Sequence, residues 1–160
     1  VRPSTRLNYM KKTDAKEEIP GKSRQAVENI YEYCRKNNAK LVLISTPSTA
    51  YWNYKRHNSV AELAESLGVE YVDMNLINDQ VGIEWSTDTR DRGMHMNIYG
   101  ARKCSAFLGA YLAKTEQFQD KRKDASYADW FDALEAFNES TDNALDRPSP
   151  EPEDNTKKAN

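Results

Sequence analysis

Two short apolar runs constrain the fold of this chain more than any other sequence feature. Residues 40–46 read KLVLIST and residues 69–75 read VEYVDMN. Each run is too short for an ordinary helix, and the first contains the β-branched residues Val42 and Ile44. Both runs therefore predict strands, and the unbroken apolar character of the first is typical of a strand that is buried on both faces.

The segment between the two runs predicts a helix. Within residues 58–67 the apolar side chains recur at helical spacing, Asn58 stands where an N-cap is expected, and Gly68 follows as the residue that ends the helix. A strand, a helix and a strand in this order form a β-α-β unit, whose strands are parallel and joined by a right-handed crossover. We therefore expect an α/β fold in which residues 40–45 pair in parallel with residues 69–73.

Three further helices follow from the same periodicity. The first begins with Ser23 as N-cap and ends at Asn37, and the second covers residues 98–112 behind the N-cap Asn97. The third covers residues 127–137 and carries an aromatic amphipathic face. This last helix is expected either to cap the domain or to bind a partner.

The composition allows one folded domain with flexible chain around it. A chain of 160 residues with 38% hydrophobic residues can bury one modest core. We expect an extended lead-in over residues 1–21, an α/β domain over 22–115, and a linker with the aromatic helix over 116–140. Residues 141–160 combine three prolines with many charged side chains, and this composition predicts a disordered tail.

Charge and residue spacing argue against several classes of partner. The formal net charge of −2 provides no field that would attract nucleic acid, and no apolar run approaches the roughly 18 residues of a membrane span. Cys34 and Cys104 lack the spacing of a zinc or redox site and predict buried free thiols, and the histidines show no metal-ligand spacing. We therefore expect no nucleic-acid partner, membrane segment, metal or cofactor. The start at Val1 instead of Met suggests a cut or processed polypeptide.

The densest polar chemistry lies at the end of a predicted loop, residues 76–97. Its last ten residues read DTRDRGMHMN and contain two aspartates, a histidine and an asparagine. His95 can carry a proton at neutral pH if a carboxylate holds its ring, and either Asp88 or Asp91 can supply that carboxylate. The alternative is that the aspartates only bind main-chain N–H groups of the loop or the helix.

Three segments together resemble a known family of hydrolases. The segments are KLVLISTPS, YWNYKRHNSVAELAESLGVEYVDMN and DTRDRGMHMNIYGARKCSAFLGAYL, within residues 22–113. In this order they look like the C-terminal half of the SGNH/GDSL-type hydrolases, in the branch similar to bacterial cell-envelope acyltransferase-like proteins. The resemblance implies a three-layer α/β/α sandwich with a parallel sheet, acyl-ester chemistry, and a location outside the cytoplasm or in the cell envelope.

The resemblance also implies roles for individual residues. His95 would be the general base and Asp91 its orienting partner, although the family usually spaces this pair Asp-x-x-His. Asn97 would shape the turn into the following helix. The family's Gly-Asp-Ser block, which supplies the nucleophile, is not found in this sequence, and Ser45 and Ser48 are interpreted as strand-end and turn residues.

A carbohydrate-facing cleft is the expected setting for this chemistry. The candidate substrate-binding residues are Trp52, His57 and Asn97, and Tyr51 and Trp85 are further aromatic residues that could stack on a sugar ring. Simple packing is the competing interpretation of the aromatic residues.

Two classes of function remain open. The chain is either the C-terminal part of an SGNH-type esterase or O-acyltransferase domain, whose nucleophile lies in a missing N-terminal part, or a non-catalytic binding or structural module with the same fold.

Overall fold

The computed structural model describes residues 1–116 and 118–145. The chain divides into two compact units, residues 1–112 and a second unit that begins at Ala113, and each is described by itself. None of the described helices is long and apolar enough to span a bilayer.

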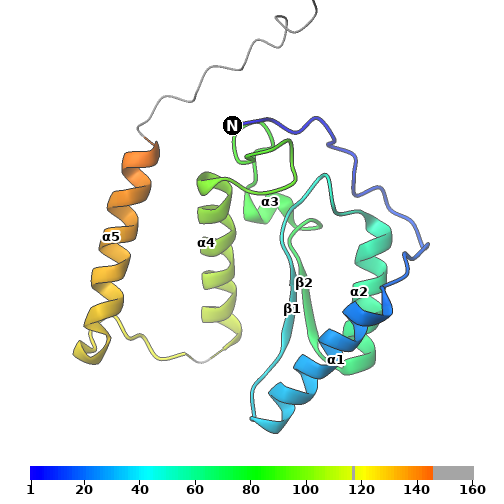
Figure 1. Cartoon of the computed structure of the whole chain (residues 1–160), viewed down its shortest axis with the longest axis horizontal. Coiled ribbons are helices and arrows are strands. Elements are labelled where there is room, and N and C mark those ends of the chain that lie inside the picture. The colour runs from blue at the N-terminus through cyan, green and yellow to red at the C-terminus, as the bar shows by residue number, and fades with distance from the viewer. Residues whose placement is uncertain (117, 146–160) are drawn as a thin grey trace, which may run out of the picture. The chain divides into compact units, whose positions relative to one another are not determined.

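A pair of parallel strands forms the centre of the first unit. Strand β1 (Val42–Ser45) pairs in parallel with β2 (Glu70–Asp73), so that Val42 lies opposite Glu70 and Ser45 opposite Asp73. Helix α2 (Tyr54–Leu67) connects them. The predicted β-α-β unit and its parallel pairing are therefore confirmed. In Figure 1, helix α2 lies on one side of the strands and helix α4 (Ile98–Thr115) lies on the other.

Helix α2 begins four residues earlier than the sequence predicts. Asn53, and not Asn58, is its N-cap, because the Asn53 side chain accepts a hydrogen bond of 2.9 Å from the main chain of Arg56. The Asn58 side chain instead donates to the carbonyls of Thr13 and Ala15 in the lead-in. The predicted C-terminal end is confirmed, since Gly68 adopts the left-handed conformation with φ +64°.

Helix α1 (Gly21–Lys36) also starts before its predicted cap. The Pro20 carbonyl accepts hydrogen bonds from the main-chain N–H groups of Ser23, at 2.8 Å, and Arg24, at 3.0 Å, so Ser23 already lies inside the first turn. Proline suits a helix start because its fixed φ matches the helix and its missing N–H would have had no partner there. The predicted end at Asn37 is confirmed.

Buried apolar side chains lie on both sides of β2: Leu63 and Ala64 of α2 are buried on one side, and a cluster that follows β2 packs against helix α4 on the other. Met74, Val81 and Ile83 are buried, and partly buried side chains pack against them, including Cys104, Phe107 and Leu108 of α4. Val81 belongs to a short helix, α3 (Asn78–Val81), inside the segment that the sequence predicted to be a loop. Both cysteines are free thiols and only partly buried.

Strand β1 is more exposed than its apolar sequence predicts. Ile44 is 37% exposed, and Val42 and Leu43 are only half-buried. The reason is that Leu43 and Ile44 line an open groove and do not meet a packed layer. The expectation of a strand buried on both faces is therefore wrong for this structure.

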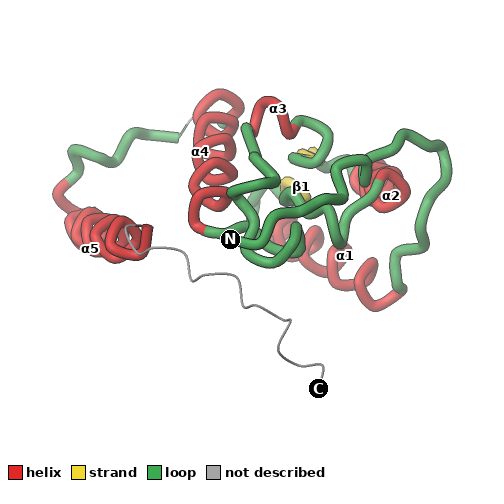
Figure 2. The backbone as a smooth tube through the Cα atoms, turned by 90° about the horizontal axis from the view of Figure 1, so that it is seen from above, coloured by secondary structure: helices red, strands yellow, loops and turns green. Residues whose placement is uncertain are grey.

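The lead-in has little regular structure (Figure 2), and its first residues are hydrogen-bonded to the polar loop. Both main-chain polar groups of Arg2 form hydrogen bonds with this loop. The Arg2 N–H donates to the Thr89 carbonyl at 3.3 Å, and the Arg2 carbonyl accepts from the Arg92 N–H at 2.9 Å. The hydroxyls of Ser4 and Thr49, both buried, share a hydrogen bond of 2.5 Å. The first residues of the chain therefore hold the loop around Asp91 in place.

The second unit contains a short 3₁₀ turn, η1 (Ala125–Tyr127), and helix α5 (Ala128–Leu145). The Asp124 side chain caps η1 by accepting from the main chain of Ser126 at 3.1 Å. The aromatic helix was expected to end at residue 137, and a disordered tail was expected from residue 141. Residues 141–145 are helical instead, and residues 146–160 lie outside the described part of the chain.

Candidate functional site

The structure brings His95 and Asp91 together in a solvent-exposed pair. The Nδ1 atom of His95 lies 2.6 Å from Oδ2 of Asp91, and the main-chain N–H of His95 donates to the other carboxylate oxygen at 2.7 Å. The side chain of His95 is 56% exposed and that of Asp91 is 24% exposed. Because Nδ1 faces the carboxylate, Nε2 is the ring nitrogen that can meet a substrate from solvent.

A closed loop fixes the geometry of this pair. Thr89 and Met96 form an isolated antiparallel bridge, and the Arg90 N–H donates to the His95 carbonyl at 3.0 Å. Gly93, between Asp91 and His95, adopts φ +89°, and a side chain there would collide with the hydroxyl of Thr49. The turn therefore requires glycine, and it directs the histidine back toward its aspartate.

The charge on Asp91 suits a role in supporting a protonated imidazole. The hydrogen bond from His95 is the main cause that holds the pKa of Asp91 below its ordinary value. The carboxylate is therefore ionised at neutral pH. An aspartate in this position fixes the histidine tautomer and stabilises the imidazolium that follows proton transfer.

Asp88 is not the partner of His95. It is buried, and its carboxylate accepts hydrogen bonds from the Lys103 ammonium at 2.7 Å and from the Glu84 main chain at 2.8 Å. Burial by itself would raise the pKa of Asp88, but the hydrogen bonds from Lys103, Glu84 and Thr87 outweigh burial and lower the pKa. Asp88 therefore anchors helix α4 to the loop, and Asp91 is the aspartate beside the histidine.

An apolar groove opens next to the exposed pair. The ring of Tyr51 meets the His95 ring edge to face, with centroids 6.1 Å apart, and both Tyr51 and Met94 line the groove together with Trp52. The groove has a volume of about 500 Å³. Much of its remaining wall comes from Ile19, Val27, Leu43, Ile44, Val60 and Leu63. His95 and Asp91 are not part of the groove wall, and Tyr51 is the residue that connects the groove to the histidine.

Neither candidate serine is bonded to His95. The buried Ser48 hydroxyl donates to the carbonyl of Gly93 at 2.9 Å, and Ser45 shares a hydrogen bond with the Tyr71 hydroxyl at 2.9 Å. Both side chains therefore have the supporting roles that a turn residue and a strand-end residue would have. The described contacts of His95 include no nucleophile that is bonded to its ring.

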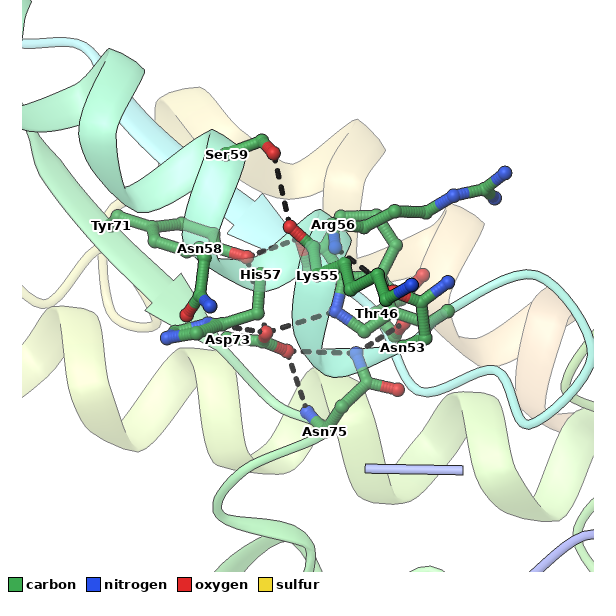
Figure 3. Close-up of polar contacts among 12 residues, drawn as sticks. Thr46, Asn53, Lys55, Arg56, His57, Asn58, Ser59, Tyr71, Asp73 and Asn75 are labelled. Atoms are coloured by element: carbon green, nitrogen blue, oxygen red, sulfur yellow. Dashed lines mark hydrogen bonds and ion pairs between the residues drawn. The ribbon is translucent and has the colours of Figure 1, made fainter. Parts of the chain in front are cut away.

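A second histidine–aspartate pair lies in the interior, at the carboxyl end of β2 (Figure 3). His57, in the first turn of α2, has Nδ1 2.8 Å from Oδ2 of Asp73. The same oxygen accepts from the Trp52 indole at 2.9 Å and from the Tyr71 hydroxyl at 3.1 Å. The other oxygen accepts two hydrogen bonds from Asn75, one from its main chain and one from its side chain.

The two histidine–aspartate pairs differ in burial, and this difference indicates different roles. The side chains of His57 and Asp73 are 18% and 3% exposed, compared with 56% and 24% for His95 and Asp91. The His57 ring is further covered by Tyr71, which stacks on it at 5.6 Å between centroids. The interior pair joins the start of α2 to the end of β2 and holds Trp52 at the groove. The exposed pair is the better candidate for chemistry.

The remaining predicted site residues have structural contacts. Asn97 caps α4 by accepting from the main chain of Tyr99 at 3.0 Å, and its amide donates to the Thr87 carbonyl at 2.6 Å. Trp85 packs against the apolar core and meets the Tyr9 ring edge to face at 5.7 Å. Its indole is therefore used in packing, whereas Trp52 faces the groove.

Sequence reasoning missed the central position of Asp73 and the pairing of Lys103 with Asp88. A signal was present for Asp73, since an ionisable residue directly ends the apolar run of the second strand. Lys103 lies fifteen residues after Asp88, and no local spacing rule connects them. Comparison of the chain with family models, with curated proteins and with solved structures gave no match, so its geometry alone supports any assignment of function.

Proposed function

We propose that this chain carries the histidine–aspartate half of an acyl-ester site, as the C-terminal part of an SGNH-type esterase or O-acyltransferase domain. In this proposal the described strands and helices form part of a three-layer α/β/α sandwich. The nucleophile belongs to polypeptide outside these residues. The substrate is an acyl ester of a carbohydrate or another cell-envelope component.

One observation carries the proposal: the Nδ1 atom of an exposed histidine is held by an ionised carboxylate at 2.6 Å, beside an apolar groove. A histidine whose Nδ1 is engaged in this way has Nε2 free to take a proton from a hydroxyl group. The groove next to it suits an acyl chain or the apolar face of a sugar ring. Tyr51, which is 52% exposed, and Trp52 supply aromatic surface for such a ring.

The proposed chemistry is general-base catalysis of acyl transfer. Nε2 of His95 accepts the proton of a hydroxyl nucleophile as its oxygen attacks the ester carbonyl, and Asp91 stabilises the resulting imidazolium. The imidazolium then returns the proton to the departing alkoxide as the tetrahedral intermediate collapses. The products are a new ester on the attacking oxygen and a free alcohol.

The alternative is a non-catalytic module with the same fold. The hydrogen bonds of Ser45 and Ser48 favour it, because both hydroxyls have partners other than His95. Under this alternative the groove binds a ligand, and the exposed histidine contributes only polar contact. The two functions differ in whether His95 accelerates acyl transfer to an added hydroxyl compound.

The experiment supplies the nucleophile from solution. The chain is incubated with 4-nitrophenyl acetate, with and without a small alcohol as acceptor, and both 4-nitrophenolate and the acetylated alcohol are measured. Without the alcohol, we expect the rate to equal that of the His95→Ala variant. With the alcohol, we expect the wild-type chain to form the new ester faster than His95→Ala and faster than Asp91→Asn.

His57→Gln is the matched control, since it changes the other histidine that is paired with an aspartate. It should retain the acceptor-dependent rate, provided that circular dichroism shows a folded chain. A large rate that depends on His95 without added alcohol would show that water or a group of the chain serves as the nucleophile. Equal rates for the wild-type chain and His95→Ala in both conditions would instead favour the binding module.

A further inference from the structure

A pocket with an excess of positive charge opens between the lead-in and the first turn of α2. It has a volume of about 500 Å³, and its wall includes Lys11, Lys12 and Lys55 together with Tyr9 and Tyr54. It shares no wall residue with the apolar groove described above. We call this feature the basic pocket.

The charge of the three lysines is not neutralised within the described part of the chain. All three are exposed, and none of them forms an ion pair with a described carboxylate. The acidic residue of the wall, Glu17, is already bound, because Arg56 donates to its carboxylate at 2.8 Å and the Asn53 amide donates at 3.2 Å. The hydrogen bond from Arg56 is the largest cause of the lowered pKa of Glu17, and the charge of Lys55 is the smallest. The basic pocket therefore keeps a net positive charge.

Hydrogen bonds fix the main chain on both sides of the two lysines in the lead-in. Before them, the Tyr9 hydroxyl donates to the side chain of Asn75 at 3.1 Å, and after them the Asn58 amide donates to the Thr13 carbonyl at 2.7 Å. In Figure 1 the lead-in accordingly passes beside α2 before α1 begins. The two walls of the pocket are thus held together without a ligand, which lowers the entropic cost of binding one.

The charge and the size of the basic pocket indicate what it binds. A cleft lined by charges of one sign concentrates ions of the opposite sign, and lysine ammonium groups are common phosphate ligands. The volume lies in the range of roughly 300 to 1,000 Å³ that is typical of small-molecule sites, so the pocket has room for more than a phosphate ion. Tyr54 adds an aromatic ring on which a sugar can pack, and its hydroxyl is bonded to no other described residue.

We propose that the basic pocket binds the phosphate monoester of a sugar. The phosphate lies among Lys11, Lys12 and Lys55, and the sugar ring packs against Tyr54. The ligand is a free sugar phosphate or a phosphorylated unit of a carbohydrate polymer, because both present the same groups. The proposal does not depend on acyl chemistry at His95, so either function can fail while the other stands.

Other anions match the basic pocket less well. A carboxylated sugar carries one negative charge, whereas a phosphate monoester carries about 1.5 to 2 at neutral pH and has three strong acceptor oxygens. A nucleic-acid strand needs a basic surface that follows its backbone over several phosphates, and the chain as a whole has a net charge of −2. Three ammonium groups around one small pocket suit a single phosphate.

Isothermal titration calorimetry of the full 160-residue chain with glucose 6-phosphate tests the proposal. Glucuronate, inorganic phosphate and glucose are the comparison ligands. We expect glucose 6-phosphate to bind at least about ten times more tightly than the other three at low salt, and its affinity to decrease as salt rises. Maltotriose phosphorylated on its terminal glucose distinguishes the two sources: tighter binding than glucose 6-phosphate assigns the site to a polymer unit, and weaker binding assigns it to a free sugar phosphate.

Variants assign the binding to the basic pocket. Replacing Lys11, Lys12 and Lys55 together with alanine should weaken glucose 6-phosphate binding at least about tenfold. The matched control removes the same charge from three exposed lysines outside the pocket and should leave binding nearly unchanged: Lys22, Lys36 and Lys114. Tyr54→Leu should weaken binding of glucose 6-phosphate but not of inorganic phosphate. Circular dichroism checks that each variant is folded.

Several results would overturn the proposal. Equal losses in the two triple variants would show that general surface charge attracts the ligand. Glucuronate binding as tightly as glucose 6-phosphate would show that the pocket selects charge and not phosphate. A single-stranded oligonucleotide that binds more tightly than glucose 6-phosphate, and is lost in the pocket variant, would identify nucleic acid as the ligand. The absence of any heat with glucose 6-phosphate in the folded wild-type chain would also contradict the assignment.

Discussion

Replacing Asp73 with asparagine removes one acceptor oxygen and the charge from the interior of the first unit while leaving the side-chain size almost unchanged. Oδ2 of Asp73 accepts from Trp52, His57 and Tyr71, and Oδ1 accepts two hydrogen bonds from Asn75. The asparagine amide must take the place of one of these oxygens. Opposite Asn75 its N–H groups face two donors, whereas on the other side only the Trp52 indole must donate, because the His57 imidazole and the Tyr71 hydroxyl can accept instead.

The less costly placement sets the expected magnitude. An amide group opposite Asn75 loses two hydrogen bonds, and an amide group opposite Trp52, His57 and Tyr71 necessarily loses only that of Trp52. A hydrogen bond to a charged group contributes about 1.5 to 3 kcal/mol, so we expect a loss of at least about 1.5 to 3 kcal/mol of unfolding free energy. This is a substantial part of the roughly 5 to 15 kcal/mol that stabilises an ordinary domain.

Urea denaturation monitored by tryptophan fluorescence measures the loss. Trp52 is a suitable probe, because its indole donates to the substituted side chain. Asp91→Asn is the matched control: it also pairs through Oδ2 with a histidine Nδ1, but on the surface. We expect a much lower urea midpoint for Asp73→Asn and a midpoint near that of the wild-type chain for Asp91→Asn. Equal midpoints for the two variants would refute the claim that burial gives Asp73 its structural role.

Three further substitutions test how the loop around the exposed pair is held. Gly93→Ala should destabilise the chain by about 2 kcal/mol because of the positive φ at this position, and it should shift the NMR resonances of the His95 ring. Gly109→Ala is the control and should do neither, because no atom lies within 4 Å of the added carbon. Unchanged His95 resonances in Gly93→Ala would contradict this prediction. Lys103→Met should cost about 2 kcal/mol at neutral pH, because it leaves the buried Asp88 without its cation. The lowered pKa of Asp88 gives stability that is present above the unfolded-state pKa of about 3.9 and lost as pH falls through the folded-state value. When the free energy of unfolding is measured as the pH is lowered through the folded-state pKa of Asp88, it should therefore decrease less for Lys103→Met than for the wild-type chain. Asn97→Ala should cost about 1 kcal/mol in thermal unfolding, and Asn97→Ser, which can still cap, should restore most of it.

The β-α-β unit was predictable because its signals are local and agree with one another. A short apolar run, a helical period and a terminal Gly68 each specify an element without reference to the rest of the chain. The start of α2 was not predictable in this way. Asn53 and Asn58 are equally good caps by residue type, and the choice depends on carbonyl groups of the lead-in that attract the Asn58 side chain.

The two histidine–aspartate pairs also differ in whether local sequence or tertiary packing brings their residues together. Asp91 and His95 lie within one tight loop, so their contact was among the arrangements that the sequence suggested, beside Asp88 as the partner or main-chain capping by the aspartates. The partners of Asp73 come from β2, from α2 and from the loop before it, and only the packed sheet brings them together. The exposure of β1 depends in turn on what covers the faces of the sheet, which a single strand's composition does not specify.

The backbone bonds between the lead-in and the polar loop have a consequence for hydrogen exchange. The Arg92 amide is bonded to the carbonyl of Arg2, which lies in a segment without helix or strand, and such segments open locally far more easily than a domain unfolds. The Arg92 amide should therefore exchange through local opening of this segment, at a rate independent of low urea concentrations. The amide of Met74, bonded to Ser45 at the end of the sheet, should exchange only through larger openings whose rate increases with urea.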